Sequence, residues 1–124
     1  MENVITRINN SGWEDWVLKK IEMDFDKIKI FVAYDEKTQV VITCKDFIGF
    51  QVIGHWDEST IEEIKIDSQG HLIEESIQMV KNLYGENPIP GGGIKNIYDN
   101  WVQLNLQFTD GIYVKIACKE IEAE

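Results

Sequence analysis

The sequence predicts an α+β protein, in which an antiparallel sheet of about five to seven strands is covered on one face by one main helix. Three observations predict this class. Strand-like alternation fills the first half of the chain, residues 71–84 have helical spacing, and a second alternating segment follows a stretch rich in Gly and Pro. The sheet should therefore consist of a meander and a C-terminal hairpin. A helix packed on such a sheet is the simplest way to bury both apolar faces, and a strongly curled sheet or partial barrel is the alternative.

Apolar and polar residues alternate with a period of two in the first half, which is typical of half-buried strands. In the first strand the alternate side chains that include Val17, Ile21 and Phe25 are expected to be buried, and only Lys19 interrupts this apolar set. Turn-forming residues separate the strands. Residues 46–56 fit neither period. The strands expected from this half are residues 17–25, 28–34, 40–44 and 61–66.

The segment from His71 to Tyr84 predicts the main helix, because its apolar residues fall on one face at 3.6 residues per turn. Asp67 or Ser68 is expected to cap the first backbone N–H groups, and Gly85 to end the helix. The expected buried face consists of Leu72, Ile73, Ile77, Val80, Leu83 and Tyr84.

Residues 85–93 contain both prolines, Pro88 and Pro90, and three consecutive glycines, so they predict a loop. The part of the chain that follows is too short for a second core, and residues 1–124 are therefore expected to form a single domain. Alternation from Val102 to Phe108, a turn at residues 109–111 and renewed alternation to residue 118 predict the hairpin.

The charge of the chain excludes several classes of function. Twelve Lys and Arg residues oppose 22 Asp and Glu residues, which gives a net charge of −10. Binding to nucleic acid or to anionic lipid needs a basic surface, so neither partner is expected. No apolar run reaches the roughly 20 residues that span a bilayer, and the first residues lack a secretory signal, which predicts a cytoplasmic location. Cys44 and Cys118 lie in strand-like runs and are expected to be buried free thiols.

No residue pattern predicts catalysis, a metal ion or a cofactor. Neither of the two histidines, His55 and His71, lies in a nucleophilic motif, and the acidic residues that follow His55 lack the spacing of an established metal site. Adjacent carboxylates such as Glu62 and Glu63 point apart on a strand, so they are expected to act as surface charge rather than as a catalytic pair.

The acidic residues are concentrated in one segment. Residues 46–75 hold eight acidic side chains and Lys65 as their basic one, so this quarter of the chain carries −7 of the net −10. Such a field attracts a basic partner and raises its rate of association. Tryptophan beside carboxylates is a suitable anchor in a protein interface. The expected partner-binding residues are Trp56, Asp57, Glu58, Glu62, Glu63, Glu74 and Glu75.

Two short segments resemble small bacterial immunity proteins. Trp13-Glu14-Asp15, which precedes the first expected strand, resembles their opening, with Glu14 in a place where related sequences often have a histidine. Asp110-Gly111 followed by residues 116–121 is similar to their closing hairpin. Such proteins neutralise polymorphic or contact-dependent toxins by binding them. The resemblance therefore implies a non-enzymatic inhibitor whose partner is a toxin.

These observations favour an acidic protein-binding domain, a monomer or weak homodimer, that masks the basic active site of a toxin such as a nuclease. An alternative is a small-molecule-binding or enzymatic α+β domain, with its site between helix and sheet or under the glycine-rich loop. A third hypothesis is self-association through the edge of the strand from Val102 to Phe108.

Overall fold

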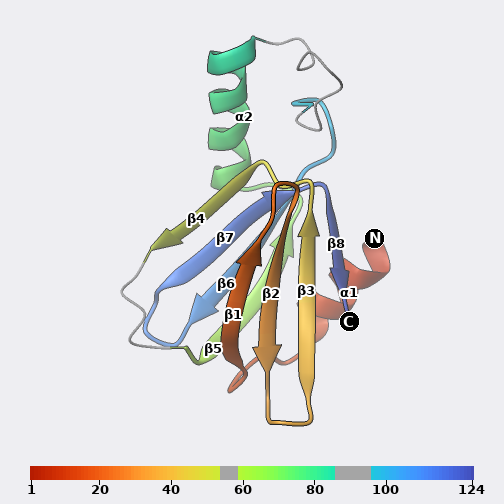
Figure 1. The fold of residues 1–124 in the computed structure, drawn as a ribbon, viewed down its shortest axis with the longest axis vertical. Coiled ribbons are helices and arrows are strands. Elements are labelled where there is room, and N and C mark those ends of the chain that lie inside the picture. Colours follow the sequence, from red (N-terminus) through yellow and green to blue (C-terminus); the bar gives the residue numbers. More distant parts are fainter. Residues whose placement is uncertain (54–58, 86–95) are drawn as a thin grey trace.

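A computed structural model describes residues 1–53, 59–85 and 96–124. The described residues form two helices and eight strands, which confirms the α+β class (Figure 1). The strands exceed the expected five to seven and divide into two sheets. In chain order the elements are α1 (Glu2–Asn10), β1 (Val17–Met23), β2 (Lys27–Ala33), β3 (Gln39–Lys45), β4 (Gly49–Ile53), β5 (Ile61–Asp67), α2 (His71–Tyr84), β6 (Val102–Phe108), β7 (Tyr113–Cys118) and β8 (Glu120–Ala123).

Each sheet has four strands, and all neighbours within it are antiparallel. Sheet A has the order β1-β2-β3-β8, and sheet B has the order β4-β7-β6-β5. The chain passes from sheet A to sheet B between β3 and β4 and returns between β7 and β8. Lys119 connects β7 of sheet B directly to β8 of sheet A, and an isolated bridge pairs Val17 with Thr60 just before β5. The strands of sheet A run across those of sheet B in Figure 1. The strands therefore form two packed sheets in place of the single sheet expected from the sequence.

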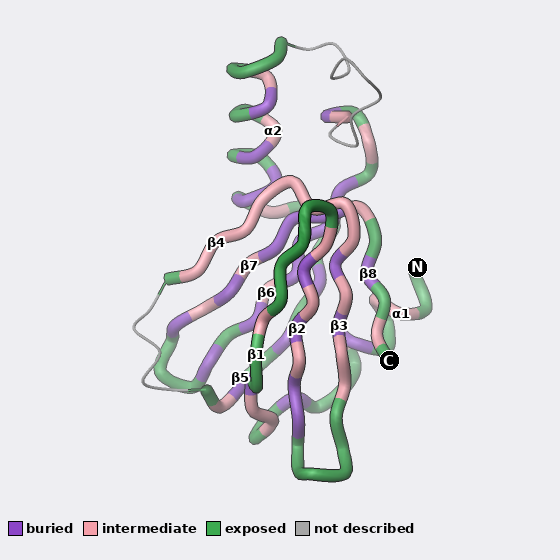
Figure 2. The backbone as a smooth tube through the Cα atoms, in the orientation of Figure 1, coloured by how far each residue is buried: buried purple, intermediate pink, exposed green. Residues whose placement is uncertain are grey.

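The main hydrophobic core lies between the two sheets. Inward-facing side chains of both sheets are almost completely buried, and they recur at alternate positions along β2, β6 and β7 (Figure 2). A strand buries every second side chain, which is why the alternation in the sequence located these strands correctly. Sheet A contributes Ile28, Ile30, Val32 and Ile42, and sheet B contributes Leu104, Leu106, Val114 and Ile116.

The expected parity of the first strand was wrong. The structure buries Leu18, whereas Val17 and Ile21 are half-buried and Phe25 is 90% exposed in the following turn. The register of β1 against β2 shifts between Leu18 and Lys20, as in a β-bulge. A bulge inserts one residue into a strand and reverses the face to which later side chains point, so a strict period of two fails here.

Helix α2 has the bounds expected from the sequence and packs on the outer face of sheet B. Leu72 and Ile73 are buried against Ala117 and Trp101. The helix approaches β4 very closely, because a Cβ atom at Gly49 would overlap Ser76 Oγ. Glycine at position 49 therefore sets the distance between helix and sheet.

The C-terminal half of α2 extends beyond the sheets, as Figures 1 and 2 show. Leu83 is 65% exposed and Tyr84 is 55% exposed, so their expected burial was wrong. Their helical phase is the one expected, but the sheet ends before it reaches them. The apolar face of α2 therefore continues past its support.

The N-terminus of α2 is capped from the sheet and not by Asp67 or Ser68. The N-cap residue is Gly70, which makes no side-chain cap. Instead, Gln103 Oε1 accepts hydrogen bonds from the backbone N–H groups of Leu72 (3.1 Å) and Ile73 (3.3 Å). These N–H groups have no acceptor within the helix, so a buried side chain from β6 satisfies them.

Helix α1 was not expected from the sequence, and it protects the edges of both sheets. Asn9 binds the backbone of Ile66 through both ends of its amide: Nδ2 donates to the carbonyl (3.0 Å) and Oδ1 accepts from the N–H (2.7 Å). Arg7 donates to the carbonyl of Ala123 in β8 (2.8 Å). The helix thus satisfies backbone groups that the edge strands β5 and β8 leave open.

The β6–β7 hairpin is confirmed. Its turn places Gly111 at φ 89°, a conformation that favours glycine, and Asp110 Oδ1 accepts from the N–H of Ile112 (3.1 Å). Strand β6 pairs with β5 on one side and with β7 on the other. Self-association through an edge of the Val102–Phe108 strand is therefore ruled out, because that strand has no free edge.

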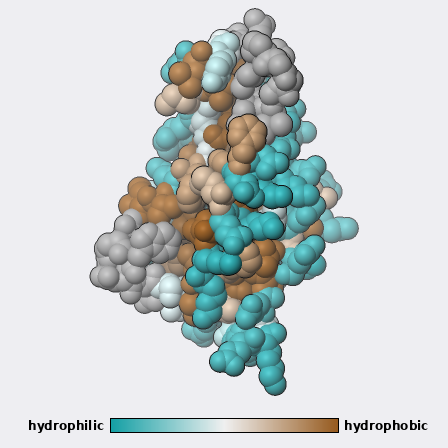
Figure 3. Space-filling view, in the orientation of Figure 1, coloured by the Kyte–Doolittle hydropathy of each residue, from teal (hydrophilic) through white to brown (hydrophobic). Residues whose placement is uncertain are grey.

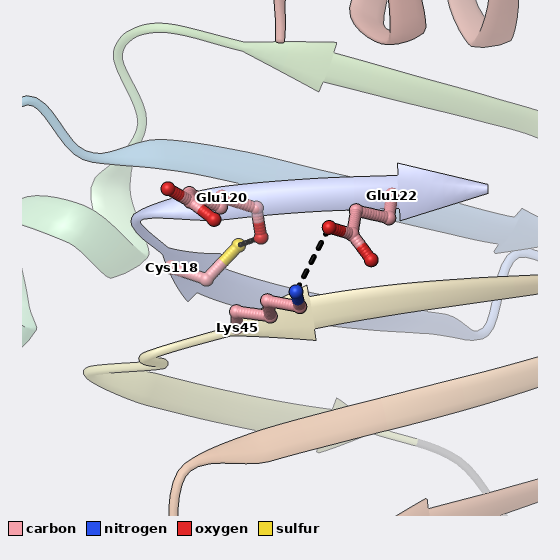
Figure 4. Close-up of polar contacts among 4 residues, drawn as sticks. All are labelled: Lys45, Cys118, Glu120 and Glu122. Carbon is pink, nitrogen blue, oxygen red and sulfur yellow. Dashed lines mark hydrogen bonds and ion pairs between the residues drawn. The ribbon is translucent and has the colours of Figure 1, made fainter.

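The corner between β7 and β8 contains both cysteines and an ion pair. Cys44 and Cys118 are buried free thiols, as expected. A hydrogen bond with the Cys44 thiol, together with burial, raises the pKa of Cys118. Figure 4 shows Cys118 directed at the carbonyl of Glu120, and Lys45 Nζ paired with Glu122 Oε1 at 2.8 Å. That hydrogen bond raises the pKa of Lys45.

Candidate functional site

The structure places the predicted partner-binding residues in two separate regions. Trp56, Asp57 and Glu58 lie outside the described residues. Glu62 and Glu63 are exposed at the start of β5, whereas Glu74 and Glu75 are exposed in the first half of α2. Strand β5 has seven residues and spans about 20 Å, at roughly 3.3 Å per residue. Glu62 and Glu63 therefore lie near the first end of this strand and Glu74 and Glu75 lie beyond its last residue, so the two pairs do not form one continuous surface.

Glu62 and Glu63 both border one shallow cavity at the start of β5. The register of β5 shifts between Ile61 and Glu63, and this β-bulge exposes both residues. This cavity has a volume of about 180 Å³, and Glu14 from the loop after α1 lines it as well. We call Glu14, Glu62 and Glu63 the acidic pocket. Within the described part of the chain, none of these three carboxylates forms an ion pair, although Lys65 also lines the cavity.

The carboxylates of α2 are less concentrated. Glu75 Oε1 lies 2.5 Å from Nε2 of His71, one helical turn earlier. His71 is exposed at the helix start, which agrees with a surface role for this histidine. Glu74 is exposed beside this pair. One of the two carboxylates of α2 therefore already has a partner within the helix.

A second cavity lies between α2 and β4. It has a volume of about 420 Å³, and its lining is predominantly apolar, with Glu75 and Ser76 as polar members. We call it the α2–β4 groove. Hydrophobic residues reach the surface over both of these elements in Figure 3. The lining residues are Ile48, Gly49, Phe50, Leu72, Glu75, Ser76, Met79, Val80, Leu83 and Tyr84.

The overhanging part of α2 forms the wall of the groove. Met79 is 58% exposed, and Leu83 lies one turn further along the same side of the helix. Large apolar side chains exposed next to one another are typical of a surface that another molecule covers. The groove therefore offers apolar contact, whereas the acidic pocket offers charge.

The described tryptophans are mostly structural. Trp13 and Trp101 are buried, and each donates its indole N–H to a backbone carbonyl, that of Ile8 (2.8 Å) and that of Asn96 (3.2 Å) respectively. Trp16 is half-buried and lies edge-on to Trp13, with 4.9 Å between ring centroids. These residues close the rim of the core, so they do not supply exposed anchors.

Within residues 1–53, 59–85 and 96–124, no three His, Cys, Asp or Glu side chains are close enough to hold a metal ion. Likewise, no helix in those ranges is both long and apolar enough to cross a membrane. Cys118 is buried with a raised pKa, which holds it as an unreactive thiol.

Sequence reasoning missed two parts of this site. Glu14 was not predicted as a site residue, although it belongs to the Trp13-Glu14-Asp15 segment, because nothing in the sequence indicated that the loop after α1 folds back onto β5. Met79 was assigned to neither face of α2. The signal that could have found the groove is the length of the apolar face of α2, which continues for a full turn after Val80.

Comparison with known proteins adds no functional information. No protein-family model matches the chain, and no curated protein matches it. A solved structure that is similar over 90% of this chain and 91% of the other is described as an uncharacterized protein from Neisseria gonorrhoeae, with 11% sequence identity and a TM-score of 0.40. A likeness at this level supports no conclusion about fold or function.

Proposed function

We propose that this α+β protein is a non-enzymatic binding domain that neutralises a basic protein partner, as immunity proteins of bacterial toxin systems do. The observation that supports this proposal is the acidic pocket, which Glu14, Glu62 and Glu63 line without an ion pair among the described residues. The net charge of −10 adds a long-range field of the same sign.

The arrangement of these carboxylates suits a partner that supplies Lys or Arg. Like charges that border one cavity repel one another. A cationic partner would remove that repulsion and would be attracted from a distance. Charge scattered over the surface would keep the protein soluble equally well, and only the local gathering favours a binding role.

The test uses the protein encoded by the reading frame next to the gene of this chain, since immunity proteins are encoded beside their toxins. The triple variant Glu14→Lys, Glu62→Lys and Glu63→Lys removes the acidic pocket. Its matched control is Asp24→Lys, Asp26→Lys and Glu36→Lys, three exposed positions in the turns that flank β2. Both variants change the net charge by the same amount.

We expect the neighbouring product to inhibit growth when expressed alone and the wild-type chain to relieve this inhibition. The acidic-pocket variant should associate at least tenfold more slowly at low salt and with a flatter salt dependence, while the control should change less than threefold. Equal effects of both variants would show that only net charge matters. Absence of binding by the wild-type chain would overturn the proposal.

One observation favours the alternative, a small-molecule-binding or enzymatic domain. The α2–β4 groove lies between helix and sheet, where this alternative requires its site, and its volume of about 420 Å³ falls in the range of ligand pockets. Native mass spectrometry of the purified protein distinguishes the two functions. A small molecule that co-purifies and is lost on substitution of Met79 and Leu83 by Ser would support the alternative.

A further inference from the structure

Three of the four edge strands in the described sheets are protected against pairing with another chain. Free edges attract foreign strands, so proteins usually cover or charge them. Strand β5 is covered by Asn9 of α1, and β8 carries Glu120 and Glu122 and receives Arg7. Strand β1 has three charged residues, a bulge, and a backbone hydrogen bond from the Leu18 N–H to the Ser59 carbonyl (2.9 Å).

Strand β4 carries no such protection. Its sequence, Gly49-Phe50-Gln51-Val52-Ile53, has no charge and no proline, and its register with β7 shows no bulge. Its inner edge pairs with β7, and in the part of the chain that the structure describes no strand pairs with its outer edge. Ile53 is 51% exposed. This strand therefore offers backbone hydrogen-bonding groups together with apolar side chains.

The α2–β4 groove lies directly beside this edge. Gly49 and Phe50 of the strand form one side of it, and Met79 and Leu83 of the overhanging helix form the other. A strand added to β4 would direct alternate side chains to the face of sheet B that α2 covers. If these side chains of the added strand enter the groove, they would bury the apolar surface of α2 that is now exposed.

We propose that the outer edge of β4 binds an extended segment of the partner by strand addition, with the apolar side chains of that segment in the α2–β4 groove. This inference rests on the proposed function, because it takes the protein to be a binding domain for a basic partner. The segment should alternate apolar residues, which the groove accepts, with polar or basic ones. Glu75 lines the groove, so its exposed carboxylate can pair with a Lys or Arg of that segment.

Charge favours a foreign segment over a second copy of this chain. Each copy carries −10, so pairing two β4 edges would bring like charges together. The position of β4 also allows one partner to contact both the β4 edge and the acidic pocket. Ile53, Tyr113, Gln107 and Glu63 occupy one row across the four strands of sheet B. Three strand spacings of about 4.8 Å place the edge about 14 Å from the acidic pocket.

The test uses a phage-displayed library of random peptides, which does not depend on the identity of the natural partner. The groove variant is Met79→Ser with Leu83→Ser. Its matched control is Met23→Ser with Phe25→Ser, which removes two other exposed apolar side chains, from the β1–β2 region. All four positions are exposed, so both variants should keep the wild-type circular dichroism spectrum.

We expect the selected peptides to alternate apolar residues with Lys or Arg and to slow hydrogen exchange at residues 49–53. They should bind the groove variant at least tenfold more weakly and the control within twofold. Recovery of no peptide, of peptides that protect other segments, or of a wild-type dimer joined through β4 would overturn strand addition. Each of these results leaves the acidic-pocket experiment unaffected, so failure of this inference and failure of the proposed function can be distinguished.

Discussion

The side-chain oxygen of Gln103 in β6 lies 3.1 Å from the backbone nitrogen of Leu72, in the first turn of α2. Gln103 is 3% exposed, and its Nε2 donates to Asn105 (2.7 Å), which in turn donates to Asp67 at the end of β5 (3.1 Å). This chain of polar contacts fixes the start of the helix on the outer face of sheet B. It also explains Gly70, because a Cβ at that position would overlap the Gln103 side chain.

Replacement of Gln103 by Leu should destabilise the protein. The change removes the acceptor of the Leu72 and Ile73 N–H groups and leaves both buried, at a cost of about 1–3 kcal/mol. Urea unfolding followed by tryptophan fluorescence measures this loss. The control is Gln107→Leu, which lies on the same face of the same strand but is exposed, and should change the free energy of unfolding by less than about 0.5 kcal/mol.

Replacement of Gly49 by Ala should force α2 away from β4. The added methyl group would overlap Ser76 Oγ and crowd Leu72, and overpacking of this kind costs about 1–3 kcal/mol. The second substitution Ser76→Gly should recover part of the loss, which a double-mutant cycle measures. Gly12→Ala is the control, since nothing lies within 4 Å of its Cβ position. Additive effects at Gly49 and Ser76 would contradict the packing described here.

Replacement of Asn9 by Ala should weaken the attachment of α1 to β5. Both hydrogen bonds to Ile66 are lost, at a cost of about 1–3 kcal/mol for the two together. Hydrogen exchange should increase at the Ile66 amide in particular. The neighbouring variant Asn10→Ala removes an exposed amide that makes no contact of this kind with β5, and it should leave that exchange rate unchanged.

The stability of the protein should fall at alkaline pH because of Cys118. The pKa of this thiol is raised above its ordinary value of 9.0, so the folded state keeps a proton that the unfolded state releases. The stabilisation is therefore complete below about pH 9 and is lost as the pH rises further, with a slope of at most about 1.4 kcal/mol per pH unit. Unfolding curves between pH 8 and 10.5 measure the slope, which should be smaller in Cys118→Ala. A thiol reagent at pH 8 should label neither cysteine before unfolding.

The β6–β7 hairpin and α2 were predictable because their periods are regular. Polar Gln103, Asn105 and Gln107 alternate with buried residues, and α2 keeps one apolar face from Leu72 to Val80. Elsewhere the tertiary structure overrides the local pattern. Bulges after Leu18 and Ile61 shift the phase of two strands, and a bulge is set by long-range pairing rather than by residue type.

The site was less predictable than the fold, since it depends on which segments meet. The sequence located the carboxylates of β5 and α2. The two pairs are far apart because β5 runs from Glu62 and Glu63 toward the start of α2. Helix α1 was missed because its apolar side is short, and with it the position of Glu14 was missed. Strand β4 showed no clear period because Phe50 and Val52 face the core between the sheets while Ile48 packs under α2.

The connection of β7 to β8 has a kinetic consequence. Strand β3 acquires its second neighbour only from β8, and the paired residues Lys45 and Glu122 are 77 positions apart. Contacts of such long range make folding slow, because the entropy of closing a large loop is lost before the contacts between the strands can form. A ribosome that adds about 5–20 residues per second would take about 4–15 s to traverse that interval. During synthesis one edge of β3 therefore stays unpaired for several seconds, the period in which a chaperone would find it most accessible.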